Sequence, residues 1–481
     1  MQATAVILLP DWRWYLLCSE GELEIPTGAI NERALGVCRA KIRNLATRAT
    51  ASPLALRLAQ GAFWSLFGQV TARTLGLLSG IFVARLLGKN GFGELGIVQS
   101  TANMFQVLAG TAIGLTATKH VAEFRNSDPK RAGRIIALSN VTSVIVGAVL
   151  ALALIISSPW LAQHTLAAPQ LAPLLRIGAL LLFFGAFSGA QGGALSGFEC
   201  FKENAQVTLW SGLIGFPIMI TAVYFWGLKG AVWGLVWSMA LTCAMNVFVL
   251  RNVMNRYQVP LSLRTSAAEL PVLWRFGLPT VLGGLVSAPV YWACNAMLVN
   301  RQSGYAEMGI LNAANQWWAA VLFLPGMLGQ VVLPVMTERL SGRGHAQARR
   351  LLWASVAANL VIVTPVIILG SVLSRDIMAS YGSQFAGARL TLVVLLVAAG
   401  MQALHTPVFN LLTAKGQMWT VLLLLLSWAI VLLALNAILV RWGALGVASA
   451  RMVSYIVSSL WIGYVAYRLI TDDAASILVT S

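Results

Sequence analysis

The feature of this chain that most constrains its fold is a series of long apolar runs, separated by short breaks rich in charged residues, Pro or Gly. A helix that crosses a bilayer needs about 20 mostly apolar residues. Runs of this kind can be read at twelve places in the sequence. They are 62–87, 93–117, 135–158, 173–197, 206–226, 230–250, 277–300, 308–334, 351–373, 388–412, 418–440 and 443–467. The pattern predicts an all-α polytopic membrane protein with about 12 transmembrane helices.

The composition supports this class and excludes two others. Of the 481 residues, 58% are apolar and 10% are charged, and the formal net charge is +17. Disordered chains with high net charge have low hydrophobicity, and nucleic-acid-binding proteins reach such a charge through many exposed Lys and Arg side chains. This sequence matches neither description. Its five cysteines are scattered without ligand spacing, so we expect neither disulfides nor a metal site.

The distribution of Lys and Arg between the loops predicts the orientation of the chain. If the N-terminus lies in the cytoplasm, the segments on the inside carry 23 Lys and Arg residues, and those on the outside carry eight. Cytoplasmic loops of membrane proteins carry such an excess. We therefore expect both termini to lie in the cytoplasm.

A repeat divides the sequence into two halves. The segment 91–99 matches the segment 304–312 at an offset of 213, with four of nine residues identical. The same offset places Gly230-Ala-Val over Gly443-Ala-Leu. Since six spans separate the copies, we expect two six-helix lobes related by a pseudo-twofold axis along the membrane normal. The expected segments are a cytoplasmic extension, poorly ordered or partly helical (1–57), an N-lobe (58–250), a cytoplasmic linker (251–276), a C-lobe (277–470) and a cytoplasmic tail (471–481).

Polar side chains recur at helical spacing on one face of several spans, together with Gly and Ser. Such faces point into the bundle, either because amides hydrogen-bond between packed helices or because they line a sugar-binding cavity. Both interpretations stay open for the amides. The candidate amides are Gln69, Asn103, Gln106, Asn295, Asn312 and Gln316.

Two arginines fall inside spans, Arg73 near the middle of the first and Arg451 in the twelfth. A mid-membrane Arg costs about 2.5–3.5 kcal/mol on insertion scales, so we expect a water-filled cavity or an anionic partner for Arg73. All sixteen acidic residues fall in tails, loops or span ends. A cationic or neutral interior suits an anionic substrate, and both arginines are candidate substrate-binding residues.

Helix-breaking residues interrupt the seventh and eighth spans. Proline removes a backbone hydrogen bond, and kinks are tolerated in membranes where they line a cavity. These positions are candidate gates, with static kinks as the alternative. They are Pro279, Gly284, Pro289 and Pro325.

No constellation typical of an enzyme occurs in the sequence. The phosphate-binding loop GxxxxGK[ST] is absent, and the four His residues are far apart in the chain. We expect a non-enzyme without a cofactor. His405 could take up a proton, but a lone buried His is more often simply hydrogen-bonded.

Several motifs near the start of the first half lie close together in the sequence. Leu66-Phe-Gly-Gln-Val is followed by Phe82-Val-Ala-Arg-Leu-Leu-Gly88 and Gly91-Phe-Gly-Glu-Leu-Gly96. Together they resemble the opening of bacterial polysaccharide flippases of the O-antigen type, in the multidrug/oligosaccharidyl-lipid/polysaccharide superfamily. The resemblance covers about residues 58–470. It implies a transporter that flips undecaprenyl-pyrophosphate-linked oligosaccharides from the cytoplasmic to the periplasmic leaflet, by alternating access with a cationic cavity. The product would be O-antigen, capsule or exopolysaccharide.

The resemblance also implies partners and a location. The partners are the lipid-linked oligosaccharide, the lipid bilayer and polysaccharide assembly proteins, without nucleic acid, and the location is the bacterial inner membrane. Whether H⁺ or Na⁺ is the coupling ion stays open.

Three alternatives stay open beside a polysaccharide flippase. A membrane polymerase or ligase of lipid-linked glycans would expose a large periplasmic loop, and the predicted outside loops are short. Lipid II flippases carry an Arg-Asp pair where this chain has Ser79-Gly80. Multidrug exporters use membrane carboxylates, which the predicted spans lack.

Overall fold

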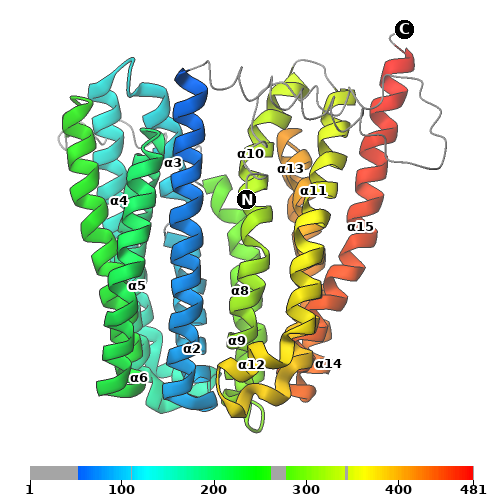
Figure 1. Ribbon diagram of the computed structural model, residues 1–481. Helices are drawn as coiled ribbons and strands as arrows, with labels where there is room; N and C mark the ends of the chain where they lie inside the picture. The colour runs from blue at the N-terminus through cyan, green and yellow to red at the C-terminus, as the bar shows by residue number, and fades with distance from the viewer. Residues whose placement is uncertain (1–52, 110, 262–277, 342–344, 480–481) are drawn as a thin grey trace, which may run out of the picture.

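The computed structural model describes residues 53–109, 111–261, 278–341 and 345–479, and these are all helices and short connections. The predicted extension 1–57 and linker 251–276 therefore lie largely outside the described residues. Figure 1 shows two groups of helices side by side. The first group contains α2 (Pro53–Ala109), α3 (Thr111–Phe124), α4 (Pro129–Trp160), α5 (Ala172–Gly197) and α6 (Phe201–Arg256). The second contains α8 (Leu278–Val299), α9 (Gly304–Val321), α10 (Phe323–Ser341), α11 (His345–Val372), α12 (Ser374–Ser380), α13 (Arg389–Ala414), α14 (Met418–Leu439) and α15 (Gly443–Val479).

Eight helical stretches in the described part of the chain are long and apolar enough to cross a membrane. This confirms the predicted class, an all-α protein with several membrane spans. The stretches Leu66–Val107, Phe201–Arg256 and Met418–Val465 have 42, 56 and 48 residues. One crossing takes about 20 residues, so each of these is long enough for more than one crossing.

Helix α2 reverses direction at Gly88, whose backbone is left-handed (φ 69°, ψ −178°). Gly80 before the turn and Gly96 after it both lie against α9. A Cβ atom on Gly80 would overlap the Gln316 amide, and one on Gly96 would lie 3.0 Å from the Asn312 side chain. Two positions on opposite sides of the turn face one short segment of α9, so α2 is a hairpin of two legs. The predicted boundary between the first two spans falls at this turn.

Helix α6 is a second hairpin, with its turn at Gly227 (φ 54°, ψ −133°). Gly215 on the first leg lies against Ser238 on the second, and Gly234 lies against Met219 in the same way. Met219 and Gly234 are both nearer to the turn than Gly215 and Ser238, so residues at equal distances from the turn face each other. The two legs are therefore antiparallel, as the predicted fifth and sixth spans require.

The turn glycines correct the alignment of the repeat near its end. Gly227 and Gly443 both have positive φ, each follows a Trp, and each precedes a second Gly by three residues. Gly230 and Gly446 then approach a backbone carbonyl so closely that neither could carry a Cβ atom. These pairs match at an offset of 216, so the predicted pairing of Gly230 with Gly443 is wrong by three residues. A three-residue match could not distinguish the turn glycine from the helical one, whereas the backbone angle does.

Replacing Gly443 by Ala is expected to lower the apparent melting temperature of the solubilised protein more than replacing Gly227 by Ala. Both turns combine a positive φ with a ψ of −133° at Gly227 and −143° at Gly443, a region that is essentially restricted to glycine and costs another residue about 1–3 kcal/mol. At Gly443 the new Cβ would also overlap the Glu307 carboxylate, whose Oε2 accepts a hydrogen bond from the Ala444 N–H at 2.8 Å. At Gly227 no described atom lies within 4 Å of the Cβ position. Equal shifts in the two variants would contradict this account.

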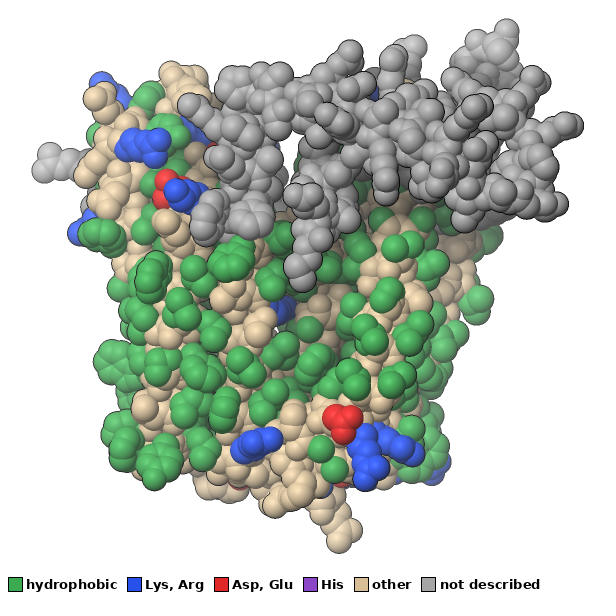
Figure 2. Space-filling view, viewed as in Figure 1, with side chains coloured by type: hydrophobic (Ala, Val, Ile, Leu, Met, Phe, Trp, Pro, Cys, Tyr) green, Lys and Arg blue, Asp and Glu red, His purple; other side chains and the backbone are tan. Residues whose placement is uncertain are grey.

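Large apolar side chains cover the outside of the bundle. Phe225 is 71% exposed, Val361 is 71% exposed and Trp461 is 61% exposed. Figure 2 shows apolar side chains over the middle of the visible face, with charged side chains toward its upper and lower ends. Such a surface is unfavourable in water over so large an area, but it suits the hydrocarbon core of a bilayer.

Candidate functional site

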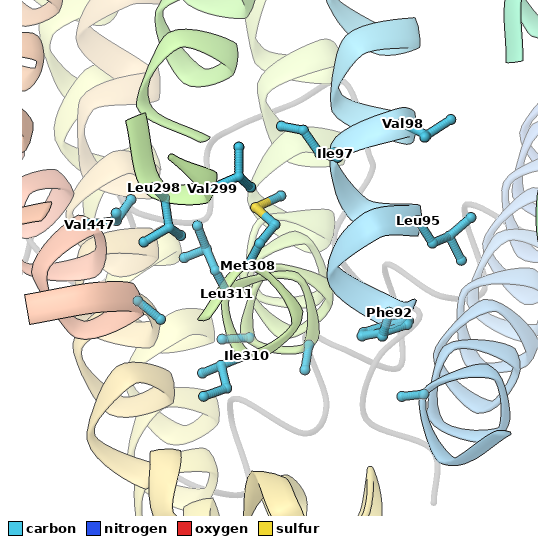
Figure 3. Packing of buried hydrophobic residues seen from close by; sticks show 14 of the residues in the cluster. Phe92, Leu95, Ile97, Val98, Leu298, Val299, Met308, Ile310, Leu311 and Val447 are labelled. Carbon is cyan, nitrogen blue, oxygen red and sulfur yellow. The ribbon is translucent and has the colours of Figure 1, made fainter. Parts of the chain in front are cut away.

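The two copies of the repeated segment contact each other where the two helix groups meet. Gly93 of α2 lies against the backbone carbonyl of Tyr305, and Gly309 of α9 lies against the backbone carbonyl of Lys89. A Cβ atom at either glycine would overlap a backbone atom, so this approach requires glycine. Buried apolar side chains from both groups surround the contact (Figure 3). Those labelled are Phe92, Leu95, Ile97, Val98, Leu298, Val299, Met308, Ile310, Leu311 and Val447.

Three hydrogen bonds between the groups lie at the same end of the bundle as the Gly88 turn, which we call the Gly88 end. In each bond a side chain donates to a backbone carbonyl on the other group. Together with the glycine contacts, these bonds close the space between the groups at this end. The bonds are Arg85 Nε to Ser380 O at 2.6 Å, Asn300 Nδ2 to Thr165 O at 2.6 Å, and Tyr305 Oη to Leu166 O at 2.7 Å.

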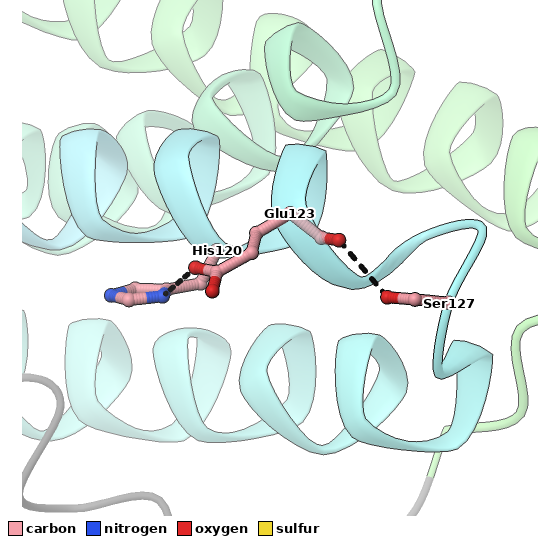
Figure 4. A network of polar contacts seen from close by, with 3 residues as sticks. All are labelled: His120, Glu123 and Ser127. Atoms are coloured by element: carbon pink, nitrogen blue, oxygen red, sulfur yellow. Dashed lines mark hydrogen bonds and ion pairs between the residues drawn. The ribbon is translucent and has the colours of Figure 1, made fainter.

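The opposite end of the first group carries charged contacts around the turn between α3 and α4, and we call it the Arg125 end. Arg125 forms an ion pair with Glu199 at 2.7 Å. His120 Nδ1 lies 3.1 Å from Glu123 Oε2, and Ser127 Oγ donates to the Glu123 backbone carbonyl at 3.1 Å (Figure 4). All of these bonds lie within the first group, so they stabilise its turns without joining it to the second.

Arg73 lies on the first leg of α2 and reaches the second group of helices. Its side chain is exposed, and its Nη2 donates to the Ala319 backbone carbonyl at 3.2 Å. It precedes the Gly88 turn by fifteen residues, which is about 22 Å along a helix. No carboxylate of the described residues forms an ion pair with it. Figure 2 shows that the visible face is hollowed between the groups and that a Lys or Arg side chain lies inside the hollow.

The carbonyl that Arg73 contacts lies beside a break between two helices. Helix α9 ends at Val321 and α10 begins at Phe323. Pro325 has no N–H group, and in a continuous helix its ring would clash with the carbonyl of Val321, four positions earlier. The last four carbonyls of a helix lack an intrahelical partner, and Ala319 is among them. The predicted break near Pro325 therefore supplies the acceptor that holds Arg73.

A cavity of about 230 Å³ lies beside Arg73, between the legs of α2 and those of α6. Ala72 and Gly76, which flank Arg73 along the helix, are part of its lining. Its polar lining consists of hydroxyl and amide side chains, which can both donate and accept hydrogen bonds. These are Ser79, Gln99, Ser211, Ser238 and Gln316.

Among the predicted amides, Gln316 lines this cavity, and its Oε1 accepts a hydrogen bond from the Tyr381 hydroxyl at 3.0 Å. Gln69 is half-buried and Asn103 is exposed, both on α2. Arg73 itself is not among the residues that line the cavity, although Ala72 and Gly76 on the same leg of α2 are.

The other predicted amides pack between helices. Asn295 donates to Ser100 Oγ at 2.9 Å, and Asn312 donates to the Phe92 carbonyl at 3.4 Å. The Gln106 amide lies against Gly185 of α5. For these three residues the structure places the amide in a helix–helix contact, which was one of the two predicted roles.

The predicted gating residues lie in different backbone settings. Helix α8 runs through Pro289 without a break, whereas Pro325 follows the break before α10. Pro279 and Gly284 are within α8, but their side-chain surroundings lie outside the described residues.

Arg451 lies in a buried cluster of the second group and does not line the cavity. It is 4% exposed, and its Nη1 donates to Asn315 Oδ1 at 2.7 Å. His405 is also buried, and its Nε2 lies 2.8 Å from Ser459 Oγ. A buried, hydrogen-bonded His is the interpretation that the sequence favoured.

Sequence reasoning missed the contributions of α6 to the cavity. Ser211 and Ser238 line it from the two legs of that hairpin. Serines are frequent in this chain, and the face that α6 turns inward depends on how the hairpin packs. Gln99, by contrast, lies at helical spacing before Asn103 and Gln106 on the polar face of the second predicted span. That spacing could have added it to the candidate substrate-binding residues.

Comparisons with known proteins add a family and a fold. The protein family described as "Polysaccharide biosynthesis protein" matches residues 58–340. The EPS I polysaccharide export inner membrane protein EpsE of Ralstonia nicotianae is 25% identical over 396 residues, which cover 80% of this chain and 88% of that protein. The lipid III flippase of Escherichia coli K12 is 23% identical over 411 residues, which cover 84% of this chain and 96% of that protein.

Solved structures of similar fold come from transporters of the MOP superfamily. An inward-facing multidrug resistance MATE family transporter matches with a TM-score of 0.70 at 16% identity, over 82% of this chain and 95% of that one. A MOP superfamily transporter from Pyrococcus furiosus, described as having a binding pocket of reverse polarity, matches with a TM-score of 0.62 at 16% identity. That match covers 85% of this chain and 94% of the other. At such identities the likeness shows the fold.

Proposed function

The chain belongs to the polysaccharide biosynthesis protein family, and from this premise we propose that it flips undecaprenyl-pyrophosphate-linked oligosaccharides across the bacterial inner membrane. The observation that carries the proposal is Arg73, an exposed cation between the helix groups whose partner is one neutral backbone carbonyl. An anionic group that entered this space would be a stronger partner for the guanidinium than that carbonyl. The transported unit supplies O-antigen, capsule or exopolysaccharide synthesis.

We propose twelve transmembrane helices in two six-helix lobes, 58–250 and 277–470, joined by the linker 251–276. The left-handed turns at Gly88 and Gly227 support two spans in each of α2 and α6. The contact between the two copies of the repeat supports a pseudo-twofold axis along the membrane normal.

In this proposal the pyrophosphate binds Arg73, and the glycan occupies the cavity beside it. Gln69, Asn103 and Gln316 contact the substrate, with the serine hydroxyls of α6. Hydroxyls and amides suit sugars because each can match a donor or an acceptor on the ring. The lipid tail stays in the bilayer between the groups.

The proposed direction of transport is based on the charge of the loops and on which end of the bundle is closed. The loops at the Arg125 end are rich in Lys and Arg, which supports a cytoplasmic location for that end and for both termini. The hollow between the groups is then closed toward the periplasm. Moving an anion outward is favoured by the inside-negative potential and releases about 2.3 kcal/mol per charge per 100 mV, and antiport of H⁺ or Na⁺ would add to this.

Alternating access requires the Gly88 end to open and the Arg125 end to close. The break at Pro325 and the kink residues of α8 (Pro279, Gly284 and Pro289) are the proposed hinges. Since the break also positions the Ala319 carbonyl, release of Arg73 to the substrate would loosen the contact between α2 and α9 at this depth.

Deletion of the coding gene, followed by lipid extraction, tests the proposed function. We expect complete undecaprenyl-linked repeat units to accumulate in membranes while remaining inaccessible to periplasmic probes. If the units reach the periplasmic face and stay unpolymerised, the protein acts as a polymerase and the flippase proposal fails. Re-expression of the unmodified chain is the control.

A further inference from the structure

Arg451 is a buried positive charge in the second group of helices. It lies on α15, and its side chain is 4% exposed. Its Nη1 donates to Asn315 Oδ1 at 2.7 Å. No carboxylate of the described residues pairs with it, and its buried Nε has no hydrogen-bond acceptor there. A buried cation of this kind is strongly unfavourable unless it is paired and its donors are satisfied.

Aromatic rings surround the guanidinium and offset only part of this cost. The Arg451 Cζ lies 4.7 Å from the centroid of the Tyr291 ring and 5.6 Å from that of Trp318. Such cation–π contacts stabilise a cation. They do not supply a hydrogen-bond acceptor for the Nε–H, which points along the plane of the guanidinium. The Arg451 Nε–H therefore lacks an acceptor among the described residues, and an anion would satisfy this donor and pair with the charge.

A second buried donor in the same cluster also lacks a partner. Trp428 packs its ring against Tyr291, with centroids 5.4 Å apart, and its Nε1 has no acceptor among the described residues. The hydroxyls of Tyr291 and Tyr455 hydrogen-bond each other at 2.8 Å. Neither of them accepts a hydrogen bond from the Arg451 Nε. The cluster thus has two unsatisfied donors, one of them charged.

We propose that this cluster binds a small inorganic anion, of the size and charge of chloride, at Arg451. The rings of Tyr291, Trp318, Trp428 and Tyr455 leave the guanidinium almost no exposed surface, so the ligand is small and is not a pyrophosphate. Arg451 on α15 bonds Asn315 on α9, so the anion stabilises the arginine that joins these two helices. The site is separate from the cavity beside Arg73, and the proposal goes beyond the flipping of a glycan.

Thermal unfolding of the purified full-length protein tests this site without any lipid-linked substrate. Chloride is titrated against gluconate at constant ionic strength. We expect a saturable rise in apparent melting temperature of roughly 5 °C when chloride reaches about 100 times its dissociation constant. No rise with chloride, or the same rise with gluconate, overturns the proposal. A pyrophosphate titration that matches chloride overturns the small-anion assignment.

Variants locate the anion. Arg451→Gln is expected to abolish the chloride effect, and Trp428→Phe, which keeps the ring, is expected to weaken it. Arg73→Gln removes the exposed arginine that contacts Ala319 between the helix groups and should leave the effect intact. If Arg73→Gln abolishes the effect and Trp428→Phe does not change it, chloride binds in the hollow and the proposal is wrong. Should Arg451→Gln not fold, bromide soaked into crystals of the unmodified protein must give an anomalous peak beside Arg451, and a peak elsewhere alone refutes the site.

Discussion

Replacing Arg73 by Ala is expected to reduce surface polysaccharide by at least about tenfold while the protein remains in the membrane at its normal level. The exposed guanidinium contacts a neutral backbone carbonyl of the opposite helix group, so its removal leaves no buried charge unpaired. What is lost is a charge-assisted bond to the substrate, worth about 1.5–3 kcal/mol, or roughly 10–150-fold in binding. Surface glycan is measured by lectin binding and protein level by blotting of membranes.

Two further variants make the Arg73 result interpretable. Arg73→Lys keeps the charge but loses the two-pronged geometry, so its activity should fall between those of Ala and Arg. Arg441, which lies 5.1 Å from the Trp442 ring, carries the same charge outside the hollow. Arg441→Ala should leave surface polysaccharide unchanged. An unchanged glycan level in Arg73→Ala would remove this residue from the substrate site.

Replacing Gly93 by Ala is the second change for which we expect a large effect. The new Cβ would overlap the Tyr305 carbonyl and crowd the backbone N of Gly309, which forces the two helix groups apart at the Gly88 end. Overpacking of this kind costs about 1–3 kcal/mol, which lowers the population of the closed arrangement roughly 5–150-fold. Transport that depends on closing this end should fall accordingly, and surface polysaccharide is the measurement.

Gly192→Ala is the matched control for Gly93. Gly192 is also a helical glycine, on α5, but no described atom lies within 4 Å of its Cβ position. The control should transport normally and reach the membrane in the same amount. Equal activity of the two variants would show that close approach of α2 to α9 is not needed for transport.

Much of the fold follows from the sequence because a bilayer restricts what an apolar run can become. In lipid, backbone groups must bond within a helix, so twelve long apolar runs predict a helical bundle with little ambiguity. The repeat at 91–99 and 304–312 also identified the two segments at which the helix groups contact each other. That these copies pack against each other could not be predicted, since the contact depends on which faces of two distant helices meet.

The candidate site was only partly predictable for the same reason. Arg73 could be singled out because a mid-span charge is costly wherever the helix packs. Its acceptor, the Ala319 carbonyl, is a backbone atom, which every residue has, so the sequence could not identify it. For Arg451 the sequence shows the charge but not the rings of Tyr291 and Trp318, which come from other helices. Its burial changes the role that we propose for it, from substrate contact to anion binding.

Reconstitution of the purified protein in liposomes tests the central claim most directly. The vesicles contain undecaprenyl-pyrophosphate-linked oligosaccharide in both leaflets, and a membrane-impermeant glycan-modifying enzyme is added outside. We predict that the unmodified protein lets the enzyme reach nearly all of the lipid-linked glycan, whereas vesicles without protein, or with Arg73→Ala, stop at about the half that starts in the outer leaflet. If all three samples stop at the same fraction, the protein does not flip this substrate and the account is wrong.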